Sequence, residues 1–211
     1  ILVTGRTRAA LGGELSRAEV PVEISSKNEI SNISGRGDHQ GIIAVAETYP
    51  YSPAEAVTEL PFGIALAIDG ITDPRNLGAV IRSAVLLGVR GILIPEKNSA
   101  PVNPVVCHTS AGATERVAIA RVRSIIHQVE IMKGRGFEAA GAEVPGKDTV
   151  DITAYSPPPK VLLVLGSEAG LRGKMRSSCN LLLSIPQQGD FDSFNVSVAA
   201  AVLLWELSRK I

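Results

Sequence analysis

The chain of 211 residues contains little cysteine or histidine: two cysteines, Cys107 and Cys179, and three histidines. Two cysteines are too few for a disulfide scaffold, and they do not stand with histidines at metal-ligand spacing, so we predict no metal site. No apolar run approaches the ~20 residues that a membrane span requires. No basic segment followed by an apolar stretch marks a signal peptide. These absences predict a soluble, cytoplasmic protein without a membrane partner.

Two common phosphate-binding fingerprints are also missing. No Gly-x-Gly-x-x-Gly follows a first strand with an acidic residue ~20 positions later, so an ordinary dinucleotide-binding enzyme is disfavoured. A Walker lysine loop is absent as well.

The 21 basic and 21 acidic residues give a net charge of zero, which argues against indiscriminate nucleic-acid binding. Any RNA contact must therefore come from local patches. Arg6, Arg8, Arg75 and Arg82 are the candidates, with ordinary solvated surface as the alternative.

The first informative segment is an apolar run that leads through a polar loop into a helix. Asp73 is a good N-cap, and Pro74 suits the first helical position because its missing N–H is not needed there. Arg75, Gly78 and Arg82 then stand at i, i+3 and i+7, so they share one helix face. That face could contact a phosphate, or it could be a solvated arginine pair.

Two later segments repeat this order of strand, glycine-bearing loop and helix. The apolar run 161–165 leads into Gly166 and Glu168. Fully apolar strands suit a parallel sheet covered on both faces, and ligands bind outside the carboxyl ends of such strands. The last segment places Ser193 and Asn195, two good N-caps, at the start of an apolar helix. A polar or anionic ligand could be held there, with simple capping as the alternative.

Taken together, the three segments resemble the three motifs of the SpoU family of RNA ribose 2′-O-methyltransferases, members of the SPOUT superfamily. The motifs correspond to residues 76–82, 165–168 and 185–199, and the resemblance covers residues 62–210. The chain is most similar to the bacterial enzymes that methylate a guanosine ribose of large-subunit ribosomal RNA.

The sequence departs from the family pattern at two of the three motifs. Glu168 is followed by a loop that is one residue and one glycine shorter than usual, and Phe194 and Gln187 replace the commoner Leu and Met. The shortened loop favours one alternative, a catalytically silent RNA-binding or ribosome-assembly protein of the same fold. The polar residues that the family uses for chemistry are all retained, which argues against that alternative.

The resemblance implies an α/β fold with a mostly parallel sheet flanked by helices, whose C-terminal part forms a trefoil knot. It implies a partial α/β RNA-substrate-binding domain over residues 1–47, a linker over 48–60 and a catalytic domain over 61–211. We expect the chain to begin inside the small domain, because only its last two-thirds are recognised; a naturally shorter version of that domain is the alternative. The resemblance also implies a homodimer, with which the apolar helix carrying Trp205 is compatible, a plain core helix being the alternative.

The activity that the resemblance implies is transfer of a methyl group from S-adenosylmethionine to a ribose 2′-hydroxyl of ribosomal RNA. A tRNA substrate is the alternative, but tRNA enzymes of the family usually carry short helical extensions in place of a leading α/β module. The catalytic residues carried over from the motifs are Arg82, Asn76, Glu168, Ser193 and Asn195. The cofactor-binding residues are Ala140, Gly141, Leu165, Gly166, Ile185, Gln187, Phe194 and Asn195.

Arg82 occupies the position of the general base proposed for the family. A base is needed because a ribose hydroxyl is a poor nucleophile until its proton is removed. An arginine normally stays protonated at pH 7, however. The prediction is therefore that Arg82 is essential, either as the base in an unusual environment or as a phosphate-binding group beside another base.

Overall fold

The chain forms two compact units in the computed structural model, Ile1–Thr48 and Tyr49–Ile211. The structure describes the following stretches: residues 1–35, 37–167, 170–189 and 192–211. Within these stretches no helix is long and apolar enough to cross a membrane.

The smaller unit is a three-stranded sheet with short helices. Its strands lie in the order β2-β1-β3, with β1 parallel to β2 and antiparallel to β3. Val3 and Ile30 are its fully buried apolar side chains, and Arg6 and Arg8 lie exposed on α1. The elements are β1 (Leu2–Val3), α1 (Gly5–Ala10), α2 (Gly12–Leu15), β2 (Glu23–Ile24), α3 (Lys27–Ser34) and β3 (Ile42–Ile43).

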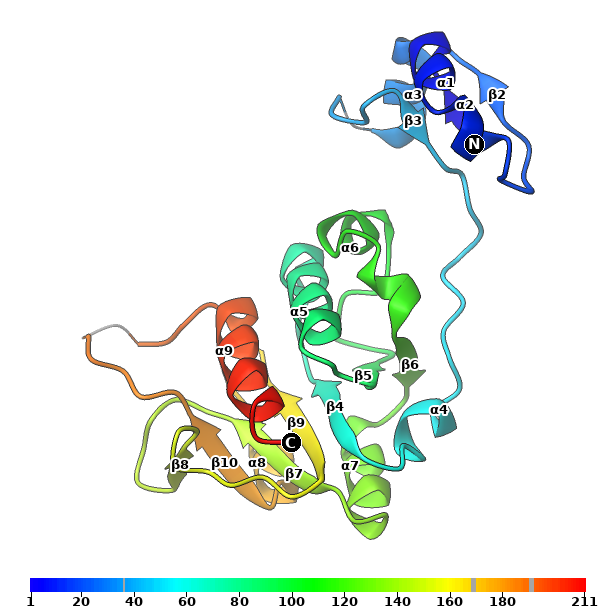
Figure 1. Cartoon of the computed structure of the whole chain (residues 1–211). Coiled ribbons are helices and arrows are strands. Elements are labelled where there is room, and N and C mark those ends of the chain that lie inside the picture. The colour runs from blue at the N-terminus through cyan, green and yellow to red at the C-terminus, as the bar shows by residue number, and fades with distance from the viewer. Residues whose placement is uncertain (36, 168–169, 190–191) are drawn as a thin grey trace. The chain divides into compact units, whose positions relative to one another are not determined.

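The larger unit is built on a seven-stranded sheet in which every pairing is parallel (Figure 1). The strand order is β6-β5-β4-β9-β7-β10-β8. Because all strands point the same way, their carboxyl ends meet at one edge of the sheet. The strands are β4 (Gly63–Ile68), β5 (Gly91–Pro95), β6 (Ala118–Val122), β7 (Glu138–Ala142), β8 (Thr149–Asp151), β9 (Lys160–Leu165) and β10 (Leu181–Ser184).

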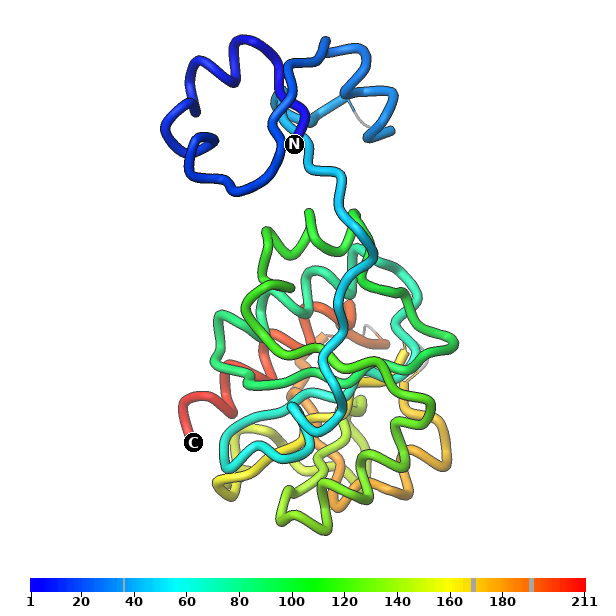
Figure 2. The backbone as a smooth tube through the Cα atoms, turned by 90° about the vertical axis from the view of Figure 1, so that its right-hand side faces the viewer, coloured from blue at the N-terminus to red at the C-terminus, as the bar shows by residue number. Residues whose placement is uncertain are grey.

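Helices cover both faces of this sheet. Alternate residues of a strand serve opposite faces: Leu66 packs in one core with α5, α6 and α9, whereas Ala65 and Ala67 pack in the other with α4, α7 and α8. Figure 2 shows α9, in red, and α7, in yellow-green, on opposite sides of the sheet. The helices are α4 (Glu55–Thr58), α5 (Pro74–Leu86), α6 (Pro104–Thr109), α7 (Ile125–Gly134), α8 (Gly173–Ser178) and α9 (Val196–Ser208).

The predicted mostly parallel α/β sheet flanked by helices is confirmed, for reasons that the sequence carries locally. All residues of β4 and β5 are buried, as a sheet covered on both faces requires. Asp73 caps α5 through a bond from the Arg75 backbone N–H to its Oδ1 (2.8 Å), and Pro74 is the first helical residue. The trefoil knot that the resemblance implies stays a prediction.

The two units divide between Thr48 and Tyr49, so residues 49–60 of the predicted linker fall within the larger unit. The Tyr49 hydroxyl donates to the carbonyl oxygen of Thr114 (2.7 Å), and Val57 of α4 is fully buried. Burial and the nearby Glu115 raise the pKa of Tyr49 to about 12. This stretch is therefore packed chain over most of its length.

Gly78 allows α5 to approach α6 closely. A methyl group at this position would lie 2.8 Å from Thr109 Cβ and 2.9 Å from the Val106 carbonyl oxygen, so the helices would have to separate. We expect Gly78→Ala to lower the free energy of unfolding by about 1–3 kcal/mol, as overpacking does, despite the better helix propensity of alanine. Denaturant unfolding followed by the fluorescence of Trp205, the single tryptophan, measures the change.

The matched control is Gly134→Ala in α7, where an added methyl group meets no heavy atom within 4 Å. This variant should be as stable as the wild type or slightly more stable. Equal unfolding free energies for the two variants would contradict the packing argument.

Candidate functional site

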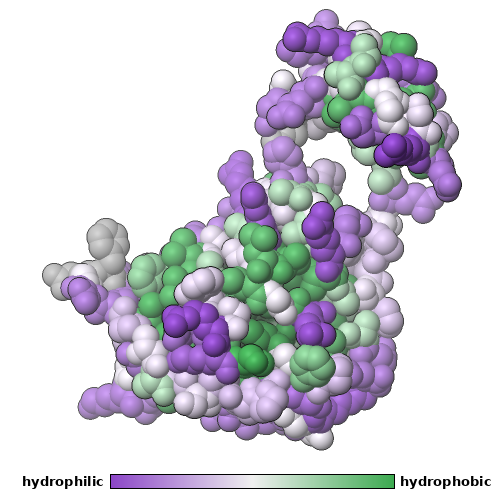
Figure 3. Space-filling view, viewed as in Figure 1, coloured by the Kyte–Doolittle hydropathy of each residue, from purple (hydrophilic) through white to green (hydrophobic). Residues whose placement is uncertain are grey.

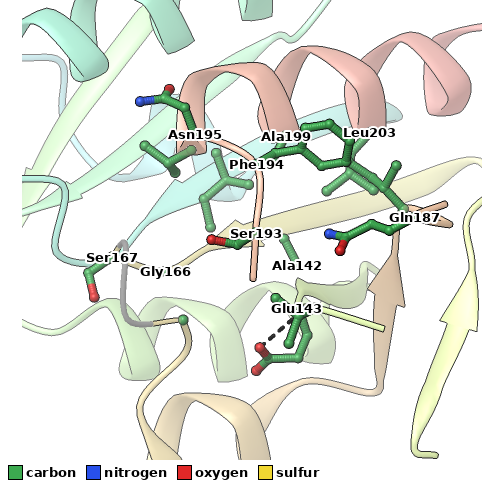
Figure 4. Close-up of a pocket in the computed structure, with 15 residues that line it drawn as sticks. Ala142, Glu143, Gly166, Ser167, Gln187, Ser193, Phe194, Asn195, Ala199 and Leu203 are labelled. Carbon is green, nitrogen blue, oxygen red and sulfur yellow. Dashed lines mark hydrogen bonds between the residues drawn. The ribbon is translucent and has the colours of Figure 1, made fainter. Parts of the chain in front are cut away.

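A cavity of about 340 Å³ lies beyond the carboxyl ends of β7, β9 and β10, beside the N-terminus of α9 (Figure 4). Its volume falls within the range of about 300–1,000 Å³ that small-molecule sites occupy. The cavity, called the strand-end cavity below, is lined by Ala142, Glu143, Val144, Leu165, Gly166, Ser167, Gly170, Ile185, Gln187, Ser193, Phe194, Asn195, Val196, Ala199 and Leu203.

The lining combines apolar walls with a few polar groups. The apolar side chains come from strand ends and from α9, and they include Leu165, Ile185 and Leu203. Polar side chains are supplied by Glu143, Ser167, Gln187, Ser193 and Asn195. Such a lining fits a small molecule whose apolar part contacts the walls and whose polar groups bind to these side chains.

Asn195 joins the starts of α9 and α5. Its Oδ1 accepts from the backbone N–H of Ser197 (2.9 Å) and from the Ser197 hydroxyl (2.7 Å), which caps α9. Its Nδ2 donates to Oδ1 of Asn76 in α5 (3.3 Å). The amide therefore fixes the N-terminus of one helix against that of the other.

A second cavity of about 380 Å³ adjoins the first along Ser167 and Val196, which line both. Its other walls come from the loop after β4 and the start of α5: Gly70, Ile71, Thr72, Asp73 and Asn76. The loop after β4 and the start of α5, where the first predicted motif begins at Asn76, therefore meet the loops after β9 and β10 around two adjoining cavities.

Six of the eight predicted cofactor-binding residues line the strand-end cavity: Leu165, Gly166, Ile185, Gln187, Phe194 and Asn195. Ala140 and Gly141 do not. Ala140 is fully buried in β7, and a Cβ atom at Gly141 would lie 2.6 Å from Leu171 Cδ1. The strand ends at Ala142, and the cavity is lined by Ala142 and by the two residues that follow it, Glu143 and Val144.

The predicted catalytic residues are only partly brought together. Asn76 and Asn195 are bonded to each other, and Ser193 lines the strand-end cavity. Arg82 lies exposed on α5 and lines neither cavity. Glu168 lies outside the described residues.

The predicted RNA-binding arginines are exposed in both units. Arg75 and Arg82 share the exposed face of α5 in the larger unit. Among the described side chains, no group of three or more His, Cys, Asp or Glu could hold a metal ion.

Sequence reasoning missed Glu143, which the structure places in the cavity wall with 12% of its side chain exposed. Its Oε1 accepts from the backbone N–H of Val144 (3.1 Å), the bond dashed in Figure 4. Its Oε2 lies 3.6 Å from Nη1 of Arg176 in α8. The signal was present, because an acidic residue directly after a buried strand of a parallel sheet stands at the edge where ligands bind.

Family comparisons agree with this geometry. The model of the SpoU rRNA Methylase family matches residues 63–205, more than half of the chain. The chain belongs to the SpoU rRNA methylase family. A second model, described as RNA 2′-O ribose methyltransferase substrate binding, matches residues 5–52, mostly within the smaller unit. The predicted family resemblance is thereby confirmed.

Curated relatives of this SpoU chain are longer than it is. A protein of Mycobacterium avium named "Uncharacterized tRNA/rRNA methyltransferase" is 37% identical over 209 residues, which cover 97% of this chain and 65% of that protein. A protein of the same name from Mycolicibacterium vanbaalenii is 36% identical over 190 residues, covering 87% of this chain and 60% of the relative. The chain thus spans 60 to 65% of the length of these two relatives.

Solved structures of RNA methyltransferases share its fold. The SpoU methyltransferase AviRb from Streptomyces viridochromogenes, in complex with AdoMet, superposes with a TM-score of 0.80 at 25% identity, covering 99% of this chain and 81% of that one. An AdoMet-bound rRNA methyltransferase from Sinorhizobium meliloti gives a TM-score of 0.78 at 23% identity, covering 99% and 78%. The predicted fold class, a flanked parallel sheet with a small leading domain, is shared by known SpoU proteins.

Asn195 offers a test of the cap at the start of α9. We expect Asn195→Ala to lower the free energy of unfolding by about 0.5–2 kcal/mol, because α9 loses its N-cap. Asn195→Ser should stay close to the wild type, since serine caps as well as asparagine does. Thermal unfolding monitored through Trp205, which lies on the same helix, measures both. If the two variants unfold alike, the capping bond contributes nothing.

Proposed function

We propose that this SpoU chain is part of an S-adenosylmethionine-dependent methyltransferase that acts in the cytoplasm on a ribose 2′-hydroxyl of large-subunit ribosomal RNA. The observation that carries the proposal is that residues of the first motif, at the start of α5, and of the loops after β9 and β10 meet around two adjoining cavities. One cavity would hold the cofactor and the other the ribose. AdoMet is bound in two solved structures that share this fold, those of the SpoU methyltransferase AviRb and of the Sinorhizobium meliloti rRNA methyltransferase, which supports the choice of cofactor.

The lining of the strand-end cavity fits S-adenosylmethionine. Its apolar side chains, Leu165, Ile185 and Leu203 among them, would hold the adenine ring. The backbone at Gly166 and the side chains of Gln187 and Ser193 would bind the polar parts. When bound, the cofactor supplies a methyl group that is activated by a positively charged sulfur.

The remaining residues would position the RNA. Asn76 lies in the second cavity and is held by Asn195, so its amide would orient a ribose there. The shared wall of Ser167 and Val196 would bring that ribose next to the cofactor, which supplies the proximity that methyl transfer needs. Arg75 and Arg82, exposed on α5, would neutralise RNA phosphates.

The choice of ribosomal RNA rests on the smaller unit. Residues 5–52, most of which belong to this unit, match the model of RNA 2′-O ribose methyltransferase substrate binding, and the names of the curated relatives include both tRNA and rRNA. Exposed Arg6 and Arg8 on α1 would add positive charge on this unit. We propose that this unit selects the ribosomal RNA and that the larger unit carries out the transfer.

A homodimer would cover an exposed apolar surface on α9 and α5. Val198, Val202 and Trp205 stand at i, i+4 and i+7 of α9 with 47%, 37% and 55% of each side chain exposed. Leu86, one turn after Arg82 on α5, is 76% exposed. Figure 3 shows hydrophobic side chains gathered over these two helices. We propose that a second copy of the chain packs here, which would bring Arg82 to the interface.

Cofactor binding is the first test of the proposed function. A Cβ atom at Gly166 would collide with the carbonyl group of Gly170, so Gly166→Ala should distort the loop at the cavity mouth. We expect saturable binding of S-adenosylmethionine to the wild type in calorimetry and at least tenfold weaker binding to this variant. The wild type should also transfer a labelled methyl group from S-adenosylmethionine to ribosomal RNA and not to tRNA.

Gly146→Ala is the matched control, because the nearest heavy atom to an added methyl group there is 3.9 Å away. It should bind the cofactor as the wild type does. A folded wild type that binds no S-adenosylmethionine would support the catalytically silent alternative, and transfer to tRNA alone would overturn the choice of substrate.

The dimer can be tested with two valine substitutions of similar exposure. Val202→Glu puts a charge in the middle of the α9 surface, whereas Val150→Glu puts one on β8, where the valine is 40% exposed. In sedimentation, we expect the wild type and Val150→Glu to have twice the 22.1 kDa mass of one chain, as dimers do. Val202→Glu should have the mass of a single chain. A dimeric Val202→Glu variant would exclude this surface as the interface.

A further inference from the structure

Glu143 is the acidic side chain among the described residues that line the strand-end cavity. It follows β7 directly, and β7 pairs in parallel with β9, Gly141 standing opposite Val164. The loop after β9 begins at Gly166, also in the cavity wall. The carboxylate of Glu143 therefore follows β7, the neighbour of the strand β9 that leads into the glycine-bearing loop.

The same spatial relation occurs in dinucleotide-binding sheets. There a glycine loop follows one strand, and an acidic residue beyond the neighbouring strand accepts hydrogen bonds from ribose hydroxyls. In the present chain the carboxylate comes before the glycine loop in the sequence, so a search for the usual order of the fingerprint cannot find it. The sheet nevertheless brings the two features side by side.

The surroundings of Glu143 hold its carboxylate ready to accept further hydrogen bonds. Oε1 accepts from the Val144 backbone N–H, and Oε2 faces Arg176 at 3.6 Å. An ionised carboxylate has about four acceptor sites, so these contacts leave room for a ligand. Only 12% of the side chain is exposed, which makes a bond to a ligand hydroxyl stronger than one formed in open water.

Arg176 ties this carboxylate to a second element. Its Nη2 lies 3.5 Å from Oδ2 of Asp148, so the guanidinium bridges the end of β7 and the loop before β8 from its place on α8. Asp148 itself is 80% exposed and does not line the cavity. Arg176 thus orients Glu143 without contacting the cavity itself.

We infer that Glu143 binds the vicinal ribose hydroxyls of an adenosine-type cofactor, with Arg176 as the residue that positions its carboxylate. The inference rests on the proposed function, because it assigns one part of the cofactor to one end of the same cavity. It predicts that the contribution of Glu143 to affinity depends on the ribose diol of the ligand and not on its amino-acid part.

The experiment measures binding by calorimetry on the full chain with three ligands. S-adenosylmethionine has both the diol and the amino acid, 5′-methylthioadenosine has the diol alone, and 2′,3′-dideoxy-5′-methylthioadenosine has neither. We expect Glu143→Ala to weaken binding of the first two about 10- to 100-fold, the range for a hydrogen bond to a charged group, and to leave the third unchanged. Glu143→Gln, which keeps the shape of the side chain, should show a smaller loss for the same two ligands.

Arg176 supplies a second readout. Arg176→Met should weaken binding of the two diol ligands and not of the dideoxy compound, and Arg176→Lys should restore part of the affinity. Asp148→Ala removes an acid that contacts the same arginine outside the cavity, and it should change affinity by less than about twofold. Unfolding followed by Trp205 fluorescence shows that each variant is folded.

The outcomes separate this inference from the proposed function. If the wild type binds none of the ligands, the proposed function fails. If the wild type binds and Glu143→Ala weakens only S-adenosylmethionine, the carboxylate contacts the amino-acid part and the inference is overturned. Equal losses for all three ligands would also overturn it, because the effect would then be structural.

Discussion

Three neighbouring strands, β4, β9 and β7, run parallel in the middle of the larger sheet, and the position of every residue in the cavities depends on this pairing. Parallel strands cannot be joined by tight hairpins, so each connection must cross over one face of the sheet. The crossovers cover both faces with helices, which explains why β4 and β5 are apolar and buried at every residue. They also bring all the loops that follow the strands to one edge, where distant parts of the sequence meet.

Helix α9 contributes to the core, to the cavity and to an exposed apolar surface. Leu204 and Leu207 are fully buried against the sheet and α5, whereas Val202 and Trp205 face outward. At its N-terminus Asn195 caps the helix and bonds to Asn76. At its C-terminus Lys210 donates to three backbone carbonyls before β9, the nearest being that of Ile152 (2.8 Å). Both ends of the helix are therefore fixed, which holds the cavity wall in place.

The motifs were predicted well because each is a local pattern. An apolar strand followed by a capped helix start specifies its own backbone, and Asp73 and Asn195 cap the helices for which they were predicted. The end of β7 shows what a local pattern leaves open. Ala140 and Gly141 lie within the strand, and the cavity begins with Ala142 and Glu143, because strand ends depend on pairing with neighbours and not on local pattern alone.

The sequence by itself determined the parallel α/β class, the three motif loops and the family, since apolar runs, caps and glycine loops act over a few neighbouring residues. Only the tertiary structure decided which side chains meet. In the folded chain Asn195 is hydrogen-bonded to Asn76, Arg82 is exposed outside the cavities, and Glu143 lies beside the loop at Gly166. These contacts join residues far apart in the chain, and the order of strands in the sheet, which no local pattern encodes, sets the distance between them.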